Sequence, residues 1–516
     1  MGYRPVCQDA PVPLDRGASR QVPPVSVVGS QVRVFCVRLE TGVVVAMAIG
    51  VRWRRRAPVV GLSLSLSIVL AVAWAPSAVA AAGSTSLVSV ASDGAQGNDP
   101  SSGPASSGDG RVVAFHSIAT NLVAGDTNAE IDILVRDRQT AETTRVSVAS
   151  DGTQANDLSV LPAINGDGRY VAFESDATNL VPGDSNVRRD IFVRDRQTAE
   201  TTRVSVASDG TQGSSEFGFS QGADASISAD GRFVAFQAGF PNLVAGDTNT
   251  CVSLPNLPPG ECPDIFVHDR QSGQTTRVSV ASDGTQANDQ SFRPAISADG
   301  RYVAFASVAS NLVPGDTNGA QGVFLGTDVF VHDRLTGQTT RVSVAADGTQ
   351  ANRESFAPTV SADGRYVAFL SLASNLVARD SNGRRNPLLG QDVFVHDRQT
   401  GQTTRVSVAA DGRQALGPSL DPSISADGQL VAFASDAANL VRMDRNSVGD
   451  VFVRDRQAGT TVRVSVASDG TQADDSSSLP AISANGGAVA FFSAATNLVV
   501  GDANQTGDVF VRELAP

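Results

Sequence analysis

One pattern of four short phrases, repeated seven times after residue 86, constrains the fold of this chain more than any other feature. Arg-Val-Ser-Val-Ala-Ser-Asp-Gly, with small changes, begins near residues 87, 145, 203, 277, 341, 405 and 463. Altered copies of Asp-Gly-Arg-Tyr-Val-Ala-Phe, Asn-Leu-Val-x-Gly-Asp and Asp-Val-Phe-Val-His-Asp-Arg follow each of these in that order. Successive copies begin 58 to 74 residues apart. Such self-similarity is typical of repeat proteins, in which every copy is one supersecondary unit.

Each copy consists of short β-branched runs separated by turn residues, which predicts strands and not helices. In the fourth copy, we expect strands at Pro294–Ser297, Tyr302–Ser307, Val329–Asp333 and Thr339–Ala345, with a hairpin turn at Asp299-Gly300. Four antiparallel strands repeated seven times predict an all-β fold, a single seven-bladed β-propeller over residues 86–513.

The phase of the repeats predicts how the ring closes. The last copy ends at a third strand, Val509–Glu513, and has no fourth strand after it. The first copy begins with an unpaired run, Leu87–Ser92, whose sequence matches a fourth strand. We therefore expect the N-terminal strand, at about 87–92, to be the outer strand of the last blade, which removes an exposed sheet edge.

The phrase Pro-x-Ile-Ser-x-Asp-Gly-Arg-Tyr-Val-Ala-Phe resembles the WD40-like PD40 repeat of TolB-family periplasmic proteins. The resemblance covers essentially all of residues 86–513. It implies a propeller and suggests a TolB-like component of the cell envelope. This chain has seven copies of the repeat, whereas the TolB propeller has six.

The segment before the repeats has the order of a secretory signal peptide. Basic residues at 52–56 precede an apolar stretch, Val59–Ala75, and the small residues Ala78-Val79-Ala80. We predict a signal peptide over residues 47–80, cleaved after Ala80 or alternatively after Ala82, so that no membrane span remains. An uncleaved membrane anchor is the alternative. Residues 1–46 are interpreted as an untranslated or disordered extension, with Met47 as the true start. The protein is then secreted or held at the exterior of the cell envelope.

Two cysteines remain after cleavage, Cys251 and Cys262, at the ends of a proline-rich insertion. In an exported protein, cysteines that close so short a loop predict a disulfide. A metal or redox site of the CxxC type is the alternative, but the ten-residue separation does not match its spacing.

The charge balance limits the partners. The chain has a formal net charge of −13, and residues 1–80 contain nine arginines against three acids. Removal of that segment makes the propeller more acidic, which argues against sequence-independent binding to nucleic acid. Calcium or a cationic partner fits an acidic surface better.

The most specific chemical motif is Asp-x-Asn-x-x-x-Asp in the loop before the third strand of four copies. Alternating oxygen ligands in a tight loop can bind Ca²⁺, which takes six to eight oxygens. The spacing also resembles, in shortened form, the calcium loops of FG-GAP-type propellers. Alternatively, these side chains only cap turns through bonds to the backbone. The candidate calcium ligands are Asp126, Asn128, Asp132, Asp184, Asn186, Asp190, Asp444, Asn446, Asp450, Asp502, Asn504 and Asp508.

Signals for catalysis are weak. Carboxylates that recur in every copy indicate structure more than chemistry. His268, His332 and His396 stand at matching third-strand positions where other copies have arginine, which predicts partly exposed cations and not a metal site. The sequence therefore favours a monomeric, non-catalytic binding or scaffold module. An extracellular hydrolase or lyase acting at the acidic mouth of the channel is the alternative.

Insertions break the repeat in the third, fourth and fifth copies. We expect them on the face of the ring that carries the Asp-x-Asn loops, which is called the acidic face below. We expect a protein or a cell-surface ligand to bind there, against a surface that includes Phe217, Phe219, Phe324 and Leu388.

Overall fold

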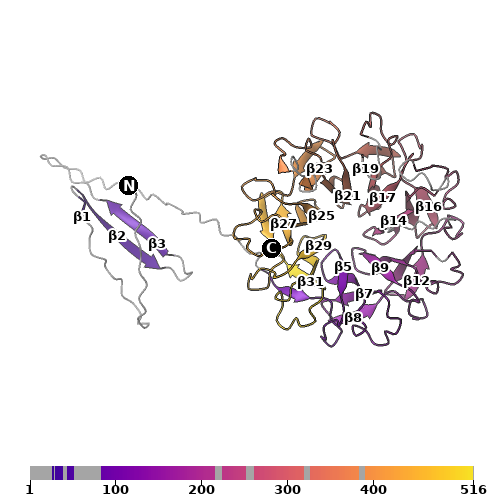
Figure 1. Cartoon of the computed structure of the whole chain (residues 1–516), viewed down its shortest axis with the longest axis horizontal. Helices are drawn as coiled ribbons and strands as arrows, with labels where there is room; N and C mark the ends of the chain where they lie inside the picture. Colours follow the sequence, from indigo (N-terminus) through magenta and orange to yellow (C-terminus); the bar gives the residue numbers. More distant parts are fainter. Residues whose placement is uncertain are drawn as a thin grey trace, which may run out of the picture. The chain divides into compact units, whose positions relative to one another are not determined.

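The computed structural model contains a closed ring of seven four-stranded antiparallel sheets, one for each copy of the repeat (Figure 1). The structure describes residues 83–186, 188–214, 224–251, 261–318, 326–382 and 390–514, and three strands nearer the N-terminus. These three strands form a separate antiparallel sheet, β1 (Ser26–Val27), β2 (Ser30–Arg38) and β3 (Val44–Gly50). The apolar stretch and cleavage site of the predicted signal peptide lie outside the described residues. Within the described ranges, no helix has the length and apolarity needed to span a membrane.

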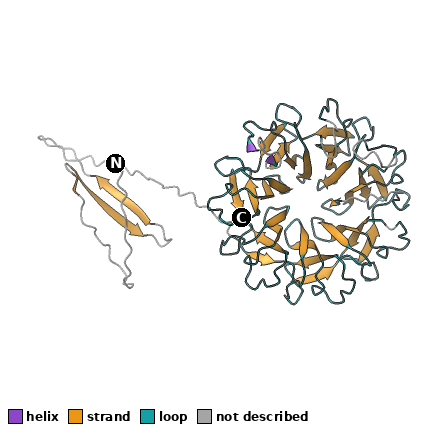
Figure 2. Ribbon diagram, viewed as in Figure 1, coloured by secondary structure: helices purple, strands orange, loops and turns teal. Residues whose placement is uncertain are grey.

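Every blade has the same strand order, from the channel to the rim of the ring (Figures 1 and 2). The innermost strands are β5 (Ser101–Ser106), β9 (Ser159–Ile164), β13 (Ser226–Ile227), β17 (Ser291–Ile296), β21 (Ser355–Val360), β25 (Ser419–Ile424) and β29 (Ser477–Ile482). The second strands are β6 (Val112–Ser117), β10 (Tyr170–Ser175), β14 (Phe233–Ala238), β18 (Tyr302–Ser307), β22 (Tyr366–Ser371), β26 (Leu430–Ser435) and β30 (Ala488–Ser493). The third strands are β7 (Asp132–Asp137), β11 (Asp190–Asp195), β15 (Asp264–Asp269), β19 (Asp328–Asp333), β23 (Asp392–Asp397), β27 (Asp450–Asp455) and β31 (Asp508–Glu513). The outer strands are β8 (Glu142–Arg145), β12 (Glu200–Arg203), β16 (Gln274–Arg277), β20 (Gln338–Arg341), β24 (Gln402–Arg405), β28 (Thr460–Arg463) and β4 (Thr85–Leu87).

The second and third strands are buried on both faces because neighbouring blades pack against each other. In the fourth blade, Phe305 and Phe330 are fully buried and stack with ring centroids 5.9 Å apart. The same hydrophobic cluster contains Val267 and Val278 from the third blade. The core of the propeller is therefore a set of layers between blades, which explains why the strands read as continuous apolar runs.

A ring of backbone hydrogen bonds joins the turns between first and second strands. The amide of Gly108 donates to the carbonyl of Gly166 in the next blade, and Gly166 donates to Ala229. The series continues from blade to blade until Asn485 donates to Gly108, which closes it. Each turn is therefore fixed by its two neighbours around the channel.

The structure confirms the seven-bladed propeller and its closure by the N-terminal strand. The closing strand, β4, pairs antiparallel with β31 through Leu87 and Phe510, Ser86 and Val511, and Thr85 and Arg512. It spans Thr85–Leu87 and so begins before the predicted range of about 87–92.

The outer strands end earlier than the sequence predicts, for a physical reason. In the fourth blade, the predicted strand Thr339–Ala345 is observed at Gln338–Arg341. The hydroxyl of Ser343 accepts a hydrogen bond from the amide of Val329, where a backbone carbonyl would continue the ladder. The alternating apolar residues of the Arg-Val-Ser-Val phrase therefore continue beyond Arg341, where the strand ends. The predicted second strand, Tyr302–Ser307, is confirmed without change.

Candidate functional site in the channel and the acidic loops

Two sets of loops interlock on the same face of the ring, as the sequence predicts. The loop between second and third strands contains Thr178 and Asn179, and the loop between blades contains Gln154 and Asn156. The Nδ2 of Asn179 donates to the carbonyl of Gln154 at 2.8 Å, and the amide of Thr178 donates to Oδ1 of Asn156 at 2.9 Å. The polar side chains of these loops thus bind the blades to one another.

Within this face, six blades place an arginine between two aspartates. In the second blade, Nη1 of Arg203 lies 3.1 Å from Asp184 and 3.5 Å from Asp190. The Nε2 of Gln212 also donates to Asp184 at 2.7 Å. The arginine is the first residue of the Arg-Val-Ser-Val phrase, and it brings a positive charge between the two carboxylates. The six groups are Arg145 with Asp126 and Asp132, Arg203 with Asp184 and Asp190, Arg277 with Asp247 and Asp264, Arg341 with Asp316 and Asp328, Arg405 with Asp380 and Asp392, and Arg463 with Asp444 and Asp450.

In three of the four predicted calcium motifs, Nδ2 of the asparagine donates to the last aspartate, and in the first motif Arg145 joins Asp126 and Asp132. In three of the four motifs, one of these arginines forms ion pairs with the aspartates. The motif of Asp502, Asn504 and Asp508 has no arginine among its described contacts. The asparagines also cap turns, since Oδ1 of Asn128 accepts from the amide of Glu130 at 3.2 Å. Calcium binding by these loops stays a prediction.

The blades with long insertions keep the same geometry, which the sequence spacing concealed. Asp264 follows Asp247 by many more residues than in the short motifs, yet both lie within 3.4 Å of Arg277. Burial and, to a lesser extent, the Asp247 carboxylate raise the pKa of Asp264 to about 7, against the lowering effect of Arg277. The arginine and glutamine partners were missed because strand pairing, not sequence proximity, brings them to the aspartates.

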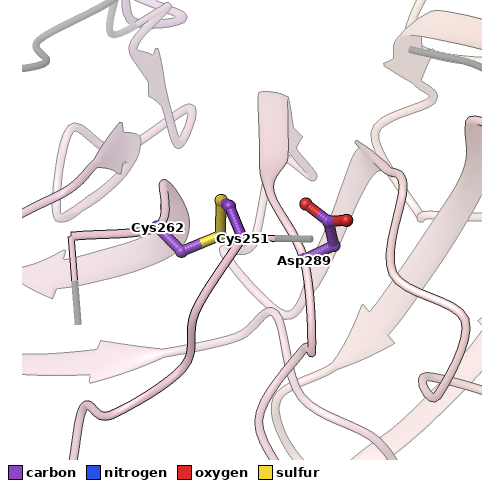
Figure 3. Close-up of side chains that lie close together, drawn as sticks. All are labelled: Cys251, Cys262 and Asp289. Carbon is purple, nitrogen blue, oxygen red and sulfur yellow. A yellow bond between two sulfur atoms is a disulfide. The ribbon is translucent and has the colours of Figure 1, made fainter. Parts of the chain in front are cut away.

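The predicted disulfide is present. Cys251 and Cys262 are bonded, with their Cα atoms 5.2 Å apart, and both are buried (Figure 3). The carboxylate of Asp289 lies near the two sulfur atoms. Because both thiols are used in the bond, this group is a covalent clamp and not a thiolate metal site.

The three matching histidines correct a prediction. His268, His332 and His396 are buried, not partly exposed, and Nδ1 of each lies 2.9 Å from a threonine hydroxyl. Burial lowers the pKa of all three, to about 4 for His396. They are neutral hydrogen-bonding groups at physiological pH. The free energy needed to remove an imidazolium from water exceeds the attraction of the neighbouring aspartate.

The channel contains a ring of residues that the sequence analysis missed. The third residue of most innermost strands forms a bulge before a proline and has a positive φ, for example 51° at Leu161 and 54° at Arg293. Non-glycine residues seldom adopt this conformation, and such strain clusters at functional sites. The seven equivalent positions are Gly103, Leu161, Asp224, Arg293, Ala357, Asp421 and Leu479. They line a cavity of about 280 Å³ on the channel.

These ring positions vary although the rest of the repeat is nearly constant. Asp224 lies 3.5 Å from Arg293, and burial raises the pKa of both Asp224 and Asp421, against the attraction of Arg293. Leu161 and Leu479 are 37% and 40% exposed. The ring therefore has an apolar part and a charged part. The signal in the sequence was the changing residue before the proline of each copy.

A second variable position lies beside this ring, on the second strands. Glu174 is fully buried, and its Oε2 lies 3.4 Å from Arg189, which also bonds Asp176 at 2.7 Å. Burial raises the pKa of Glu174 to about 7, and the Asp224 carboxylate contributes to the shift. At the same position of the first blade, His116 packs under Gly103, where a Cβ atom would lie 2.6 Å from the imidazole ring.

The predicted partner surface falls on segments that the structure does not describe. Phe217, Phe219, Phe324 and Leu388 all lie outside the described residues, so their surface stays a prediction.

Comparisons with known proteins give structural likeness only. No protein-family profile and no curated protein matches the sequence. Similar solved structures include an oligogalacturonate lyase of Vibrio parahaemolyticus, 12% identical, covering 80% of this chain and 90% of the lyase, with a TM-score of 0.46. They also include a candidate TolB of Agrobacterium tumefaciens, 15% identical, covering 73% of this chain and 96% of that protein, with a TM-score of 0.36. An acylaminoacyl peptidase of Pyrococcus horikoshii is 12% identical over 81% of this chain and 52% of the peptidase, with a TM-score of 0.46.

Proposed function

We propose that this protein is an exported, monomeric, non-catalytic β-propeller that binds a protein or cell-surface ligand at the mouth of its channel. The observation that carries the proposal is the ring of channel positions, most of them in strained bulges, which differ from blade to blade in a repeat that is otherwise nearly uniform. A purely structural position in such a repeat would be expected to keep one residue. Strained, variable positions facing a cavity are typical of a ligand site.

The chemistry of the ring favours an amphipathic ligand with a positive charge. Leu161 and Leu479 come from the blades on either side of the first blade, which contributes only Gly103. Asp224 and Asp421 lie on the other part of the ring together with Arg293, so that two carboxyl groups there face one cation. An apolar group beside a basic group, as in a peptide with both side chains, would complement this pattern.

Export is part of the proposal. It is supported by the order of basic, apolar and small residues over 47–80 and by the Cys251–Cys262 disulfide, since disulfides persist in oxidising compartments. Membership of the WD40-like PD40 repeat family is also proposed, on the phrase described above. Cell fractionation and N-terminal sequencing test these statements: a mature chain beginning at Ala81 or Gly83 outside the cytoplasm supports them.

The binding function is tested by affinity capture from the native surface fraction. A double variant, D224N/D421N, should lose a partner that the wild-type protein retains. A control variant, E142Q/E200Q, removes the same amount of charge at exposed positions of the outer strands and should retain it. Retention of every partner by both variants contradicts a channel site.

A second candidate is a hydrolase or lyase with its site in the channel. Asp224, Asp421 and Glu174 are carboxylates that break the repeat beside the cavity, and carboxyl groups with raised pKa values can serve as general acids. Glu174 is completely buried and so does not contact the cavity, which favours the binding function over catalysis. A screen of glycans and lactones separates the two: turnover that is lost in D224N and D421N supports an enzyme.

A further inference from the structure

The closing blade differs from the other six at one charged position on the acidic face. In those six blades, an arginine at the end of the outer strand lies between two aspartates. In the closing blade, this position is Leu87. The register establishes the equivalence, because Leu87 pairs with Phe510 in the same way that Arg463 pairs with Phe452.

The two aspartates are nevertheless present. Gln96 bridges them: its Nε2 donates to Oδ1 of Asp502 at 2.7 Å and to Oδ2 of Asp508 at 2.8 Å. The Nδ2 of Asn504 donates to the same oxygen of Asp508 at 2.9 Å. All of these donors are neutral, and the ion pairs of the described residues include none to Asp502 or Asp508. Two neighbouring carboxylates therefore share amide donors where every other blade supplies a guanidinium.

Two buried oxygen atoms at this place have no hydrogen-bond partner. They are Oδ2 of Asp502 and Oγ1 of Thr506. A buried carboxylate oxygen without a donor or a cation is costly, because it has lost its water and gained nothing in return. Burial also raises the pKa of Asp508, and the charge of Asp502 adds to the shift. In the other blades the arginine partly offsets such costs.

We propose that the closing blade binds a calcium ion between Asp502 and Asp508, in the place that arginine takes in the other six blades. The unpartnered oxygens of Asp502 and Thr506 supply ligands together with Asp508. Rotation of the Gln96 amide adds a carbonyl ligand, at the cost of the hydrogen bond that its Oε1 accepts from the amide of Ala503 at 3.0 Å. These are hard oxygen donors of mixed type, which suit the flexible coordination of Ca²⁺ better than the strict octahedron of Mg²⁺.

The site goes beyond the channel function and does not depend on it. Of the four predicted Asp-x-Asn calcium motifs, the proposal keeps only the one in the closing blade. In the other three motifs, Arg145, Arg203 and Arg463 supply the positive charge. A calcium ion here would join the N-terminal segment, through Gln96, to the last blade, and would therefore stabilise the closure of the ring.

The test uses the full chain, stripped with EDTA and then titrated with calcium chloride in isothermal calorimetry and thermal melts. We expect one calcium ion per chain, with a dissociation constant of roughly 0.1–1 mM, the range of extracellular modules. The melting temperature should rise by a few degrees at saturating calcium, and by less with magnesium at the same concentration.

Two variants that make the site less negative in different ways, one by removing a ligand and one by supplying a cation, make the test specific. D502N removes a ligand, and L87R supplies the arginine of the other blades, so both should weaken calcium binding at least tenfold. L87R should in addition match or exceed the wild-type melting temperature in EDTA, which shows that it is folded. A control variant, D151N, removes an exposed acid of the same face and should bind as the wild type does. Absence of saturable binding by the wild type, magnesium binding as strong as calcium binding, or binding unchanged in both L87R and D502N, overturns the proposal.

Discussion

Leu87 and Phe510, which lie at opposite ends of the propeller sequence, are direct partners across the last pair of strands of the ring. The pairing extends beyond the strand itself. The amide of Val88 donates to the carbonyl of Val509 at 2.8 Å, and the hydroxyl of Ser89 donates to the buried carboxylate of Asp508 at 2.5 Å. The segment around Leu87 thus completes the last blade, although its strand is one residue shorter than the outer strands of the other blades.

Deletion of residues 84–92 should destabilise the whole propeller. The deletion exposes the edge of β31 and removes Val88, which is buried between the first and last blades. We expect the melting temperature to fall by roughly 5 °C or more. A melting temperature equal to that of the protein without the deletion would show that closure contributes little.

Replacement of one of the six buried arginines should be costly. R341L leaves Asp316 and Asp328 beside each other without a cation, and breaking a buried ion pair in this way costs about 3 kcal/mol or more. R413L is the matched control, since Arg413 is 74% exposed and pairs only with the exposed Asp411. Thermal melts should show a large loss for R341L and almost none for R413L. Similar melting temperatures for R341L and R413L would show that the buried arginine–aspartate groups contribute little to stability.

Glu174 should make stability depend on pH. Its pKa in the folded protein is raised to about 7 from an ordinary 4.5. The folded state therefore holds the proton more tightly than the unfolded state, and the resulting stability is full below pH 4.5 and lost as the pH rises through 7. E174Q, which stays neutral, should match the wild type at low pH and exceed its melting temperature by a few degrees at about pH 8.

Melts of wild type, E174Q and the exposed control E142Q across this pH range give the comparison. A constant difference between E174Q and the wild type at every pH contradicts the raised pKa of Glu174.

The disulfide should contribute a measurable but local stabilisation. It closes a short loop between Cys251 and Cys262, and loop-closure entropy for this separation gives about 3 kcal/mol. C251S/C262S should therefore unfold at a lower temperature or urea concentration than the wild type. A reductant should shift the wild type towards the variant and leave the variant itself unaffected. If the wild type and the variant have the same stability, and a reductant does not change that of the wild type, the disulfide contributes nothing to stability.

The fold could be predicted because local signals agree in every copy. The turn at Asp299-Gly300 and the strand Tyr302–Ser307 need only nearby residues, and both are as expected. The innermost strand was less accurate, since Pro294–Ser297 is observed at Ser291–Ile296. A bulge around Arg293 and Pro294 lets the strand include a proline, which ordinary pairing rules count against.

The candidate sites were harder to predict because they depend on long-range pairing. Arg463 reaches Asp444 only after two strands have paired, so the Asp-x-Asn motif read alone suggests a metal and omits the arginine. The exception in the closing blade was visible as Leu87 at the start of the first copy, but its meaning required the register with Phe510. The channel ring was overlooked because variation in a repeat looks like drift until the structure places the variable residues around one cavity.

The position of β4 also sets an order on folding. Synthesis begins at the N-terminus, so β4 is the first part of the propeller to emerge and its partner β31 is the last. Six blades can form while Thr85–Leu87 still has no sheet to join. The early strand is short and has three residues, which limits its tendency to pair with other chains during that interval. The ring is thus fastened only when the chain is complete, and a truncated product would be left with an open seventh blade.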